Sequence, residues 1–242
     1  MKAQHDANSI IVALDVPSAA EALELVDQIG PAAEFYKVGM ELYAGEGMEI
    51  VEQLASFGKR VFLDLKLYDI PETVKRATRE ICRRSAVKML TVHGSRRIME
   101  AAREGCGDSE TQLLAVTVLT SFDQEDLADL GYEVGLESLV DLRVKKAMAA
   151  GINGIVCSSL DVARVRQIGG ARLTLVTPGV RSAGFEASDQ KRIATPDQAL
   201  RNGADYVVIG RQITRAKNPR LACEEVLSEV GRDAAICVPH TN

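Results

Sequence analysis

The sequence predicts an α/β protein built as a single (β/α)8 barrel, the TIM barrel architecture. Three observations lead to this prediction: a length of 242 residues, eight short apolar runs that each precede a helix-like stretch, and a content of only 4% aromatic residues. A barrel of eight strand–helix units typically takes about 250 residues. Parallel strands covered by helices need an aliphatic core, and 46% hydrophobic residues supply one.

The first four strand–helix units are expected in the amino-terminal half of the chain. Residues 10–16 form the first apolar run, Ser18 opens the helix after it, and Gly30 with Pro31 ends that helix near residue 29. The next three strands are expected at residues 34–38, 60–67 and 88–92, and their helices end near residues 57, 84 and 104.

The remaining four units follow with no break in composition. Their strands are expected at residues 111–119, 154–157, 172–177 and 206–209, and helices at 137–150, 196–202 and 219–230. Ser158 or Ser159 is expected to cap the helix after the sixth strand. The acidic run is expected to be a solvated loop containing Asp123, Glu125, Asp126 and Asp129. Because right-handed crossovers leave no simpler arrangement for eight alternating units, we expect a closed parallel barrel.

One catalytic domain is expected at residues 10–230, between an amino-terminal tail of residues 1–9 and a carboxy-terminal tail of residues 231–242. No run approaches the ~20 apolar residues of a membrane span, and the first ten residues lack the apolar core of a signal peptide. Five scattered cysteines indicate neither a disulfide framework nor a zinc site. From this cysteine pattern we expect a cytoplasmic protein. A net charge of -5 gives no positively charged surface for nucleic acid or an anionic membrane, so we expect neither partner.

The most informative stretch is residues 60–73, RVFLDLKLYDIPET, where an apolar strand ends in charges. Successive side chains of a strand point to opposite faces, so Phe62, Asp64 and Lys66 share one face. The other face carries Val61, Leu63, Leu65 and Leu67. Charges at the end of a buried strand are costly unless they pair, so a purely structural ion pair is one interpretation.

The residues that follow this strand favour a functional site instead. Asp69 adds a third charge, Pro71 turns the chain out of the strand, and Thr73 lies at the start of the next helix. Polar residues also end the other expected strands: Asp15, Lys37, His93, Thr120, Arg181 and Arg211. Because active sites of such barrels lie at the carboxyl ends of the strands, these side chains are expected to converge on one mouth. We interpret His93 as a hydrogen-bonded residue of the rim rather than a catalytic base.

The loops after the seventh and eighth strands are predicted to bind phosphate. Gly210 lets the backbone approach an anion, and Arg211 offers a bidentate hydrogen-bond donor. The long loop of residues 178–192 contains Arg181 and Gln190. Its glycines, Gly179 and Gly184, are expected to act as hinges of a lid that closes over the ligand.

Seven segments of the chain together resemble the bacterial-type, single-domain orotidine 5'-phosphate decarboxylases. They are IVALD at 11–15, YKVG at 36–39, DLKLYDIPET at 64–73, VTVLTS at 116–121, TPGVR at 177–181, SDQKR at 188–192 and IGRQIT at 209–214. The resemblance runs from about residue 10 to about residue 230 in the family's order and spacing. One departure is Gln212, which stands where many members have proline.

The resemblance implies a cofactor-free and metal-free conversion of orotidine 5'-monophosphate to uridine 5'-monophosphate and CO2. It assigns the catalytic roles to Lys66 as proton donor with Lys37, Asp64 and Asp69. It places Asp69, Ile70 and Thr73 in the active site of a neighbouring subunit, and so implies a homodimer with shared sites. The remaining contacts are implied to be Asp15 and Lys37 to the ribose, Thr120 to the base, and Arg181, Gln190, Gly210 and Arg211 to the phosphate.

Two other interpretations stay open at this point. A related sugar-phosphate decarboxylase, such as a 3-keto-gulonate 6-phosphate decarboxylase, shares the Asp-x-Lys-x-x-Asp strand but resembles a magnesium enzyme with an acid at the end of the second strand. This chain has Lys37 in that place, and a lysine would repel the cation. The second alternative is a non-catalytic barrel that binds a phosphorylated ligand.

Overall fold

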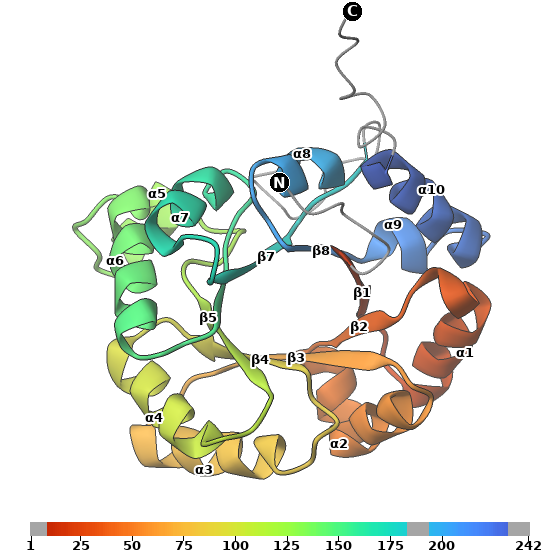
Figure 1. The fold of residues 1–242 in the computed structure, drawn as a ribbon, viewed down its shortest axis with the longest axis horizontal. Helices are drawn as coiled ribbons and strands as arrows, with labels where there is room; N and C mark the ends of the chain where they lie inside the picture. The colour runs from red at the N-terminus through yellow and green to blue at the C-terminus, as the bar shows by residue number, and fades with distance from the viewer. Residues whose placement is uncertain (1–8, 183–193, 232–242) are drawn as a thin grey trace, which may run out of the picture.

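The computed structural model describes residues 9–182 and 194–231, and it shows a closed barrel of eight parallel strands with helices outside them (Figure 1). Each strand pairs with the next one along the chain, and the last pairs with the first. The strands are β1 Ile10–Leu14, β2 Phe35–Val38, β3 Arg60–Leu67, β4 Met89–His93, β5 Gln112–Val116, β6 Gly154–Val156, β7 Thr174–Pro178 and β8 Tyr206–Ile209. The predicted (β/α)8 architecture is therefore confirmed.

Some helices begin where the local sequence supplies a cap or a proline. The Ser18 hydroxyl accepts a hydrogen bond from the Glu21 amide at the start of the first helix, and Pro71 occupies the first turn of the third. Their bounds are α1 Ala19–Ile29, α2 Met40–Ser56, α3 Pro71–Cys82, α4 Arg96–Cys106, α5 Gln124–Asp129, α6 Leu136–Ala149, α7 Val162–Gly169, α8 Pro196–Arg201, α9 Arg211–Thr214 and α10 Pro219–Gly231, with a 3-10 turn at Gly30–Ala32. Within the described ranges, none of these helices combines the length and apolarity needed to cross a bilayer.

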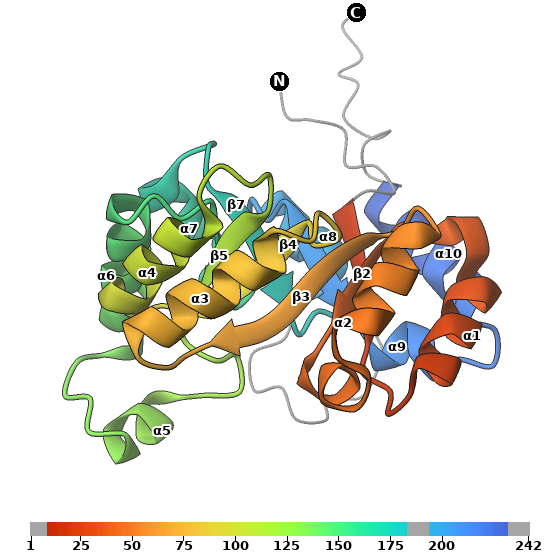
Figure 2. The same cartoon turned by 90° about the horizontal axis from the view of Figure 1, so that it is seen from below.

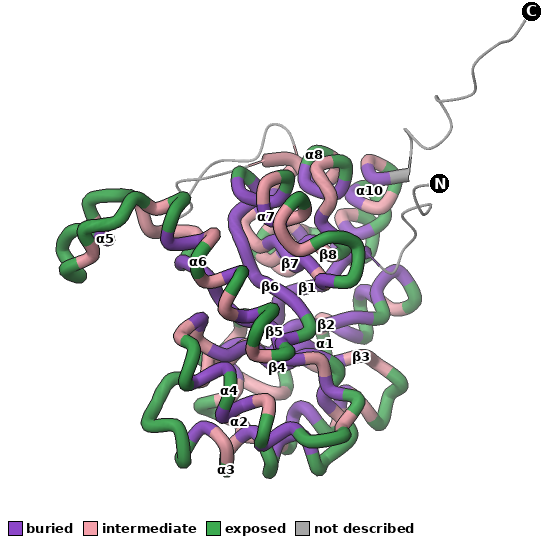
Figure 3. The backbone as a smooth tube through the Cα atoms, turned by 60° about the vertical axis from the view of Figure 1, so that its left-hand side comes forward, coloured by how far each residue is buried: buried purple, intermediate pink, exposed green. Residues whose placement is uncertain are grey.

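The prediction of a solvated loop for the acidic run is wrong, because part of that run is helical. Asp123 caps α5, and the carboxylate of Asp126 accepts a hydrogen bond from the Asp123 amide in return. This reciprocal capping box satisfies backbone donors that a short helix leaves open. Figures 2 and 3 show α5 standing away from the barrel wall on exposed chain.

The start of α7 also differs from the prediction. The residue that precedes the helix is Asp161, and neither Ser158 nor Ser159 caps it. Both serines are buried, and the Ser158 hydroxyl accepts a hydrogen bond from the Leu160 amide in the turn before the helix. Strand β5 is shorter than predicted as well, so Thr120 lies in the loop beyond it.

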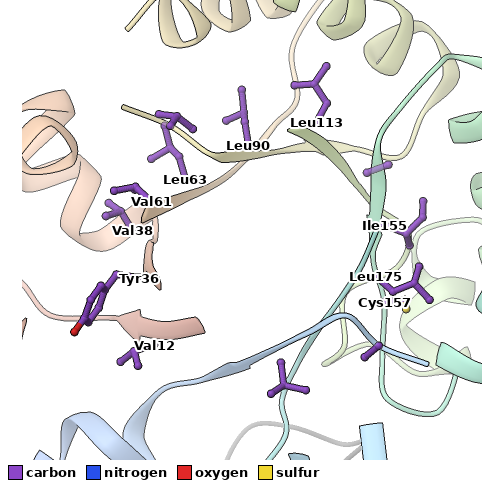
Figure 4. Close-up of a cluster of buried hydrophobic side chains, with 14 of the residues drawn as sticks. Val12, Tyr36, Val38, Val61, Leu63, Leu90, Leu113, Ile155, Cys157 and Leu175 are labelled. Carbon is purple, nitrogen blue, oxygen red and sulfur yellow. The ribbon is translucent and has the colours of Figure 1, made fainter. Parts of the chain in front are cut away.

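Two hydrophobic clusters follow from the alternation of side chains along the strands. The larger cluster lies between the strands and the helices, and Figure 4 shows members such as Val12, Val38 and Leu63 pointing away from the barrel centre. The smaller cluster fills the barrel interior with Ile11, Ala13, Phe35, Phe62, Met89, Leu114, Val116, Val156, Val176 and Val208. Because side chains fill the interior, a ligand can enter only at an end of the barrel.

Two cysteine thiols meet where α3 and α4 end. The sulfurs of Cys82 and Cys106 lie 3.4 Å apart as free thiols, and both side chains are buried. The hydrogen bond from Cys82 lowers the pKa of Cys106, and the same contact together with burial raises the pKa of Cys82. All four described cysteines are free thiols in this structure.

Candidate active site

The barrel interior becomes charged at the carboxyl ends of three neighbouring strands. In each of β1, β2 and β3, an apolar interior residue is followed two positions later by a charge on the same face. The pairs are Ala13 with Asp15, Phe35 with Lys37, and Phe62 with Asp64. The strand period alone thus directs these charges into the mouth of the barrel.

Strand β3 is irregular at the position of its charges. Leu63 pairs with Leu90 and Leu67 pairs with Val92, so four steps along β3 face two steps along β4. Lys66 adopts a φ of 49°, a left-handed conformation that is uncommon for a residue with a side chain. Such strain persists where the surrounding structure enforces it, and it gathers at functional sites.

The charged side chains form an alternating row. The Asp15 carboxylate lies 2.8 Å from the Lys37 ammonium, which is 4.0 Å from Asp64, and Asp64 lies 2.9 Å from the ammonium of Lys66. The side chains of Lys37 and Asp64 are only 11% and 14% exposed, whereas that of Lys66 is 34% exposed. Opposite charges at these distances offset the cost of desolvation, and Lys66 keeps access to a ligand.

Gly39 leaves the room that this row requires. A Cβ atom at this position would lie 2.8 Å from the Lys37 ammonium and 3.0 Å from an Asp15 oxygen. Any side chain at residue 39 would therefore push Lys37 away from Asp15. This contact explains the glycine that ends the YKVG segment.

A cavity of about 400 Å³ opens over the charged row, a size typical of small-molecule sites. Interior residues such as Phe62, Val156 and Val208 form its apolar lining. The predicted site residues that line it are Asp15, Lys37, Asp64, Lys66, Thr120, Arg181, Gly210 and Arg211. Gln190 and the expected hinge Gly184 lie outside the described residues, whereas Gly179 is part of the cavity wall.

Three predicted site residues do not line this cavity. Asp69, Ile70 and Thr73 lie on the loop after β3 and the first turn of α3, and all three are exposed. The Asp69 carboxylate accepts a hydrogen bond from the Ile70 amide, 2.6 Å away. Ile70 and the neighbouring Tyr68 are 66% and 69% exposed, which is unusual for such large apolar side chains.

His93 differs from the hydrogen-bonded rim residue that we predicted. Its ring stacks on Tyr68, with centroids 4.1 Å apart, and its Nδ1 atom is buried without a hydrogen-bond partner among the described residues. Burial, with a smaller contribution from the charge of Arg143, lowers the pKa of His93 to about 4. The imidazole is therefore neutral near pH 7.

Two residues of the site were missed as functional residues. Thr91 is fully buried on β4, and its hydroxyl lies between the Lys66 amide and the Asp64 carboxylate. Its position two residues after Met89, on the interior face, is the sequence signal that could have found it. Gln212, noted only as a departure from a motif, lines the cavity, accepts a hydrogen bond from the Ser182 amide and donates one to the Ser182 hydroxyl.

Comparison with known proteins identifies the family of this chain. The model of the "Orotidine 5'-phosphate decarboxylase / HUMPS family" matches residues 8–226. The chain belongs to this family. The resemblance found in the sequence motifs is thereby confirmed.

Members of the orotidine 5'-phosphate decarboxylase / HUMPS family match this chain over nearly its whole length. An orotidine 5'-phosphate decarboxylase of a Bradyrhizobium species is 47% identical over 94% of this chain and 93% of its own. That of a Rhodopseudomonas palustris strain is 45% identical over 94% and 96%. The crystal structure of orotidine 5'-phosphate decarboxylase from Lactobacillus acidophilus superposes with a TM-score of 0.81 at 31% identity, covering 92% and 99% of the two chains.

The lowered pKa of His93 predicts a pH dependence of stability. The ordinary pKa of 6.5 applies to the unfolded chain and about 4 to the folded chain, so the unfolded state binds more protons between these values. The free energy of unfolding therefore falls as the pH falls from 6.5 to 4. Denaturant unfolding of His93→Asn over this range should show a shallower pH dependence than the wild type.

The matched control for this measurement is His240→Asn, which alters a histidine outside the described residues. Its unfolding free energy should follow the wild-type pH dependence, because this variant keeps His93 and the same titrating carboxylates as the wild type. Identical slopes for His93→Asn and the wild type would show that burial does not hold His93 neutral.

Proposed function

We propose that this chain is a carboxy-lyase that converts orotidine 5'-monophosphate to uridine 5'-monophosphate and CO2 in pyrimidine biosynthesis, without a cofactor. The observation that carries the proposal is the Lys37–Asp64–Lys66 row beneath a cavity of nucleotide size. Curated relatives named orotidine 5'-phosphate decarboxylase, 43–47% identical to this chain, support the choice of substrate.

The charged row meets the physical demand of this reaction. Loss of the carboxylate leaves an electron pair in the plane of the pyrimidine ring, where ring resonance cannot absorb it. A fixed positive charge at that position stabilises the developing carbanion. The half-buried ammonium of Lys66 supplies the charge and then donates its proton to the same ring carbon.

The neighbours of Lys66 hold it and bind the rest of the nucleoside. Asp64 accepts the hydrogen bond of the ammonium and lies where the departing carboxylate would sit. Asp15 and Lys37, joined at 2.8 Å, are placed to bind the ribose hydroxyls. Thr120 lines the cavity on the loop after β5 and contacts the base.

The phosphate binds at the side of the cavity formed by the loops after β7 and β8. Arg181 and Arg211 both line this side, and Gly210 lies directly before α9. A guanidinium group matches the geometry of a phosphate with two parallel hydrogen bonds. Gln190, outside the described residues, completes the set. Binding energy gained here is remote from the reacting carbon, yet it can lower the barrier by fixing the substrate in place.

The active protein is a homodimer in which each site receives residues of both chains. Asp69, Ile70 and Thr73 stay outside the cavity of their own chain, although the motif that contains them continues directly from Lys66. Exposed Met40, Tyr68 and Ile70 follow the ends of β2 and β3 and offer apolar surface to a second copy. Asp69 of one chain then extends the alternating charges of the other beyond Lys66.

The alternative reaction, a magnesium-dependent sugar-phosphate decarboxylation, does not fit the geometry of the charged row. Its cation would need carboxylates at the ends of β2 and β3. Here the ammonium of Lys37 ends β2 and lies 2.8 Å from Asp15 and 4.0 Å from Asp64. That positive charge repels a second cation at Asp64. The non-catalytic alternative has no observation in its favour, and any turnover would exclude it.

We assign the activity to the cytoplasm. The scattered cysteines, which have neither the pattern of a disulfide framework nor the spacing of a zinc site, support this assignment.

The decisive experiment follows the absorbance of orotidine 5'-monophosphate mixed with the purified protein in EDTA. The wild type should turn the substrate over, and Lys66→Ala should lose roughly 1,000-fold or more in kcat because it lacks the proton donor. Lys145→Ala, which removes an exposed lysine of α6, is the matched control and should keep full activity. Absence of wild-type turnover would reject the function, and near-normal turnover by Lys66→Ala would reject the role of that lysine.

Arg211→Ala should mainly weaken substrate binding. Loss of a charge-assisted hydrogen bond to the phosphate should raise KM roughly 10- to 100-fold in steady-state assays. Arg220→Ala removes an exposed arginine that pairs with Glu224 on α10, and its KM should match the wild type. An unchanged KM in Arg211→Ala would contradict a phosphate contact.

If the site is shared, two inactive variants should regain activity when their chains form mixed dimers. Once Lys66→Ala and Asp69→Ala proteins exchange subunits, each mixed dimer contains one intact site, and equal amounts should recover about one quarter of wild-type activity. A mixture of Lys66→Ala with Asp64→Ala should recover none, because both residues serve the site of their own chain. If the first mixture stays inactive while mass spectrometry detects mixed dimers, the sites are not shared.

A further inference from the structure

Thr91 lies at the point where the ladder between β3 and β4 is interrupted. It is fully buried on β4, between Leu90 and Val92, the two residues that pair with Leu63 and Leu67. Its side chain shares the interior face with Met89, yet it does not line the cavity. Thr91 therefore faces the irregular segment of β3 from inside the barrel wall.

The Thr91 hydroxyl both accepts and donates a hydrogen bond, and both of its partners belong to β3. Its oxygen accepts a hydrogen bond from the backbone amide of Lys66 at 2.8 Å. The same hydroxyl donates to Oδ1 of Asp64 at 2.9 Å, while Oδ2 of Asp64 accepts from the Lys66 ammonium at 2.9 Å. These three hydrogen bonds close a ring through Thr91, Asp64 and both ends of Lys66.

The irregular strand makes this ring necessary. The extra residues of β3 and the left-handed φ of Lys66 carry its amide out of the regular ladder. A half-buried amide without a partner is unfavourable, and Thr91 supplies the partner. The hydroxyl also fixes which oxygen of Asp64 remains for the ammonium.

We propose that Thr91 is a positioning residue, which holds Asp64 and Lys66 in their reactive arrangement without touching the substrate. The proposal rests on the proposed function, because it assigns a step to that same site. Its chemical requirement is a hydroxyl at this position rather than a side chain of a given size. Valine has nearly the same shape as threonine but can neither accept from the Lys66 amide nor donate to Asp64.

The kinetic test compares Thr91→Val with Thr91→Ser. A displacement of about 1 Å at a catalytic group can cost about 100-fold in rate, so kcat of Thr91→Val should fall by about that factor. KM should change little, because the contacts to ribose and phosphate remain. Thr91→Ser keeps the hydroxyl and should recover most of kcat. Thr78→Val, at a buried threonine of α3 whose hydroxyl has no partner among the described residues, should keep wild-type kcat.

A second readout is independent of turnover. Hydrogen exchange of the Lys66 amide, followed by NMR, should be slow in the wild type, Thr91→Ser and Thr78→Val and faster in Thr91→Val. If Thr91→Val does not fold, Thr91→Ala replaces it in both measurements. A wild type without turnover would reject the proposed function, and amide exchange would then decide the role of Thr91.

Three results would overturn the proposal. The first is a Thr91→Val protein with wild-type kcat. The second is an equal loss of kcat in Thr91→Val and Thr91→Ser, which would show that the packing of the side chain matters and its hydroxyl does not. The third is a Lys66 amide that exchanges as fast in the wild type as in Thr91→Val.

Discussion

The hydrogen bond between the Asp64 carboxylate and the Lys66 ammonium, 2.9 Å long, is the interaction on which the rest of the site depends. It lies at the end of a barrel whose interior cluster is apolar, so neither charge is tolerated there alone. Lys37 and Asp15 extend the compensation along two more strands, and Gly39 leaves room for it. The barrel thus holds an ammonium group ready in a place where water would otherwise have to solvate it.

Much of this arrangement was predictable because it follows from the period of a strand. Phe62, Asp64 and Lys66 lie on the interior side as expected, and Leu63, Leu65 and Leu67 pack against the helices. The interruption opposite Thr91 was not predictable, since the two extra residues of β3 leave no local composition signal. The stacking of His93 on Tyr68 and the burial of its Nδ1 atom are likewise tertiary features with no local sequence signal.

Other differences between the predicted and the observed structure arose where two local sequence signals compete. The acidic run was interpreted by its charge, although Asp123 and Asp126 have the spacing of a capping box and begin a helix. Two serines after β6 resembled caps, but both are buried and the helix starts later, after Asp161. The residues that line the cavity from the chain's own strands could be read from one sequence. Those proposed to serve a neighbouring chain could be assigned only through the resemblance to a family.

The interrupted ladder between β3 and β4 also affects which stabilising mutations such a protein can tolerate. A barrel in which β3 and β4 paired without the extra residues would keep every regular hydrogen bond and would relieve the left-handed backbone at Lys66. Variants selected for heat resistance alone would therefore tend to shorten or flatten this segment and lose the lysine's placement. The least regular part of the sheet is where thermostability and chemistry impose opposite demands.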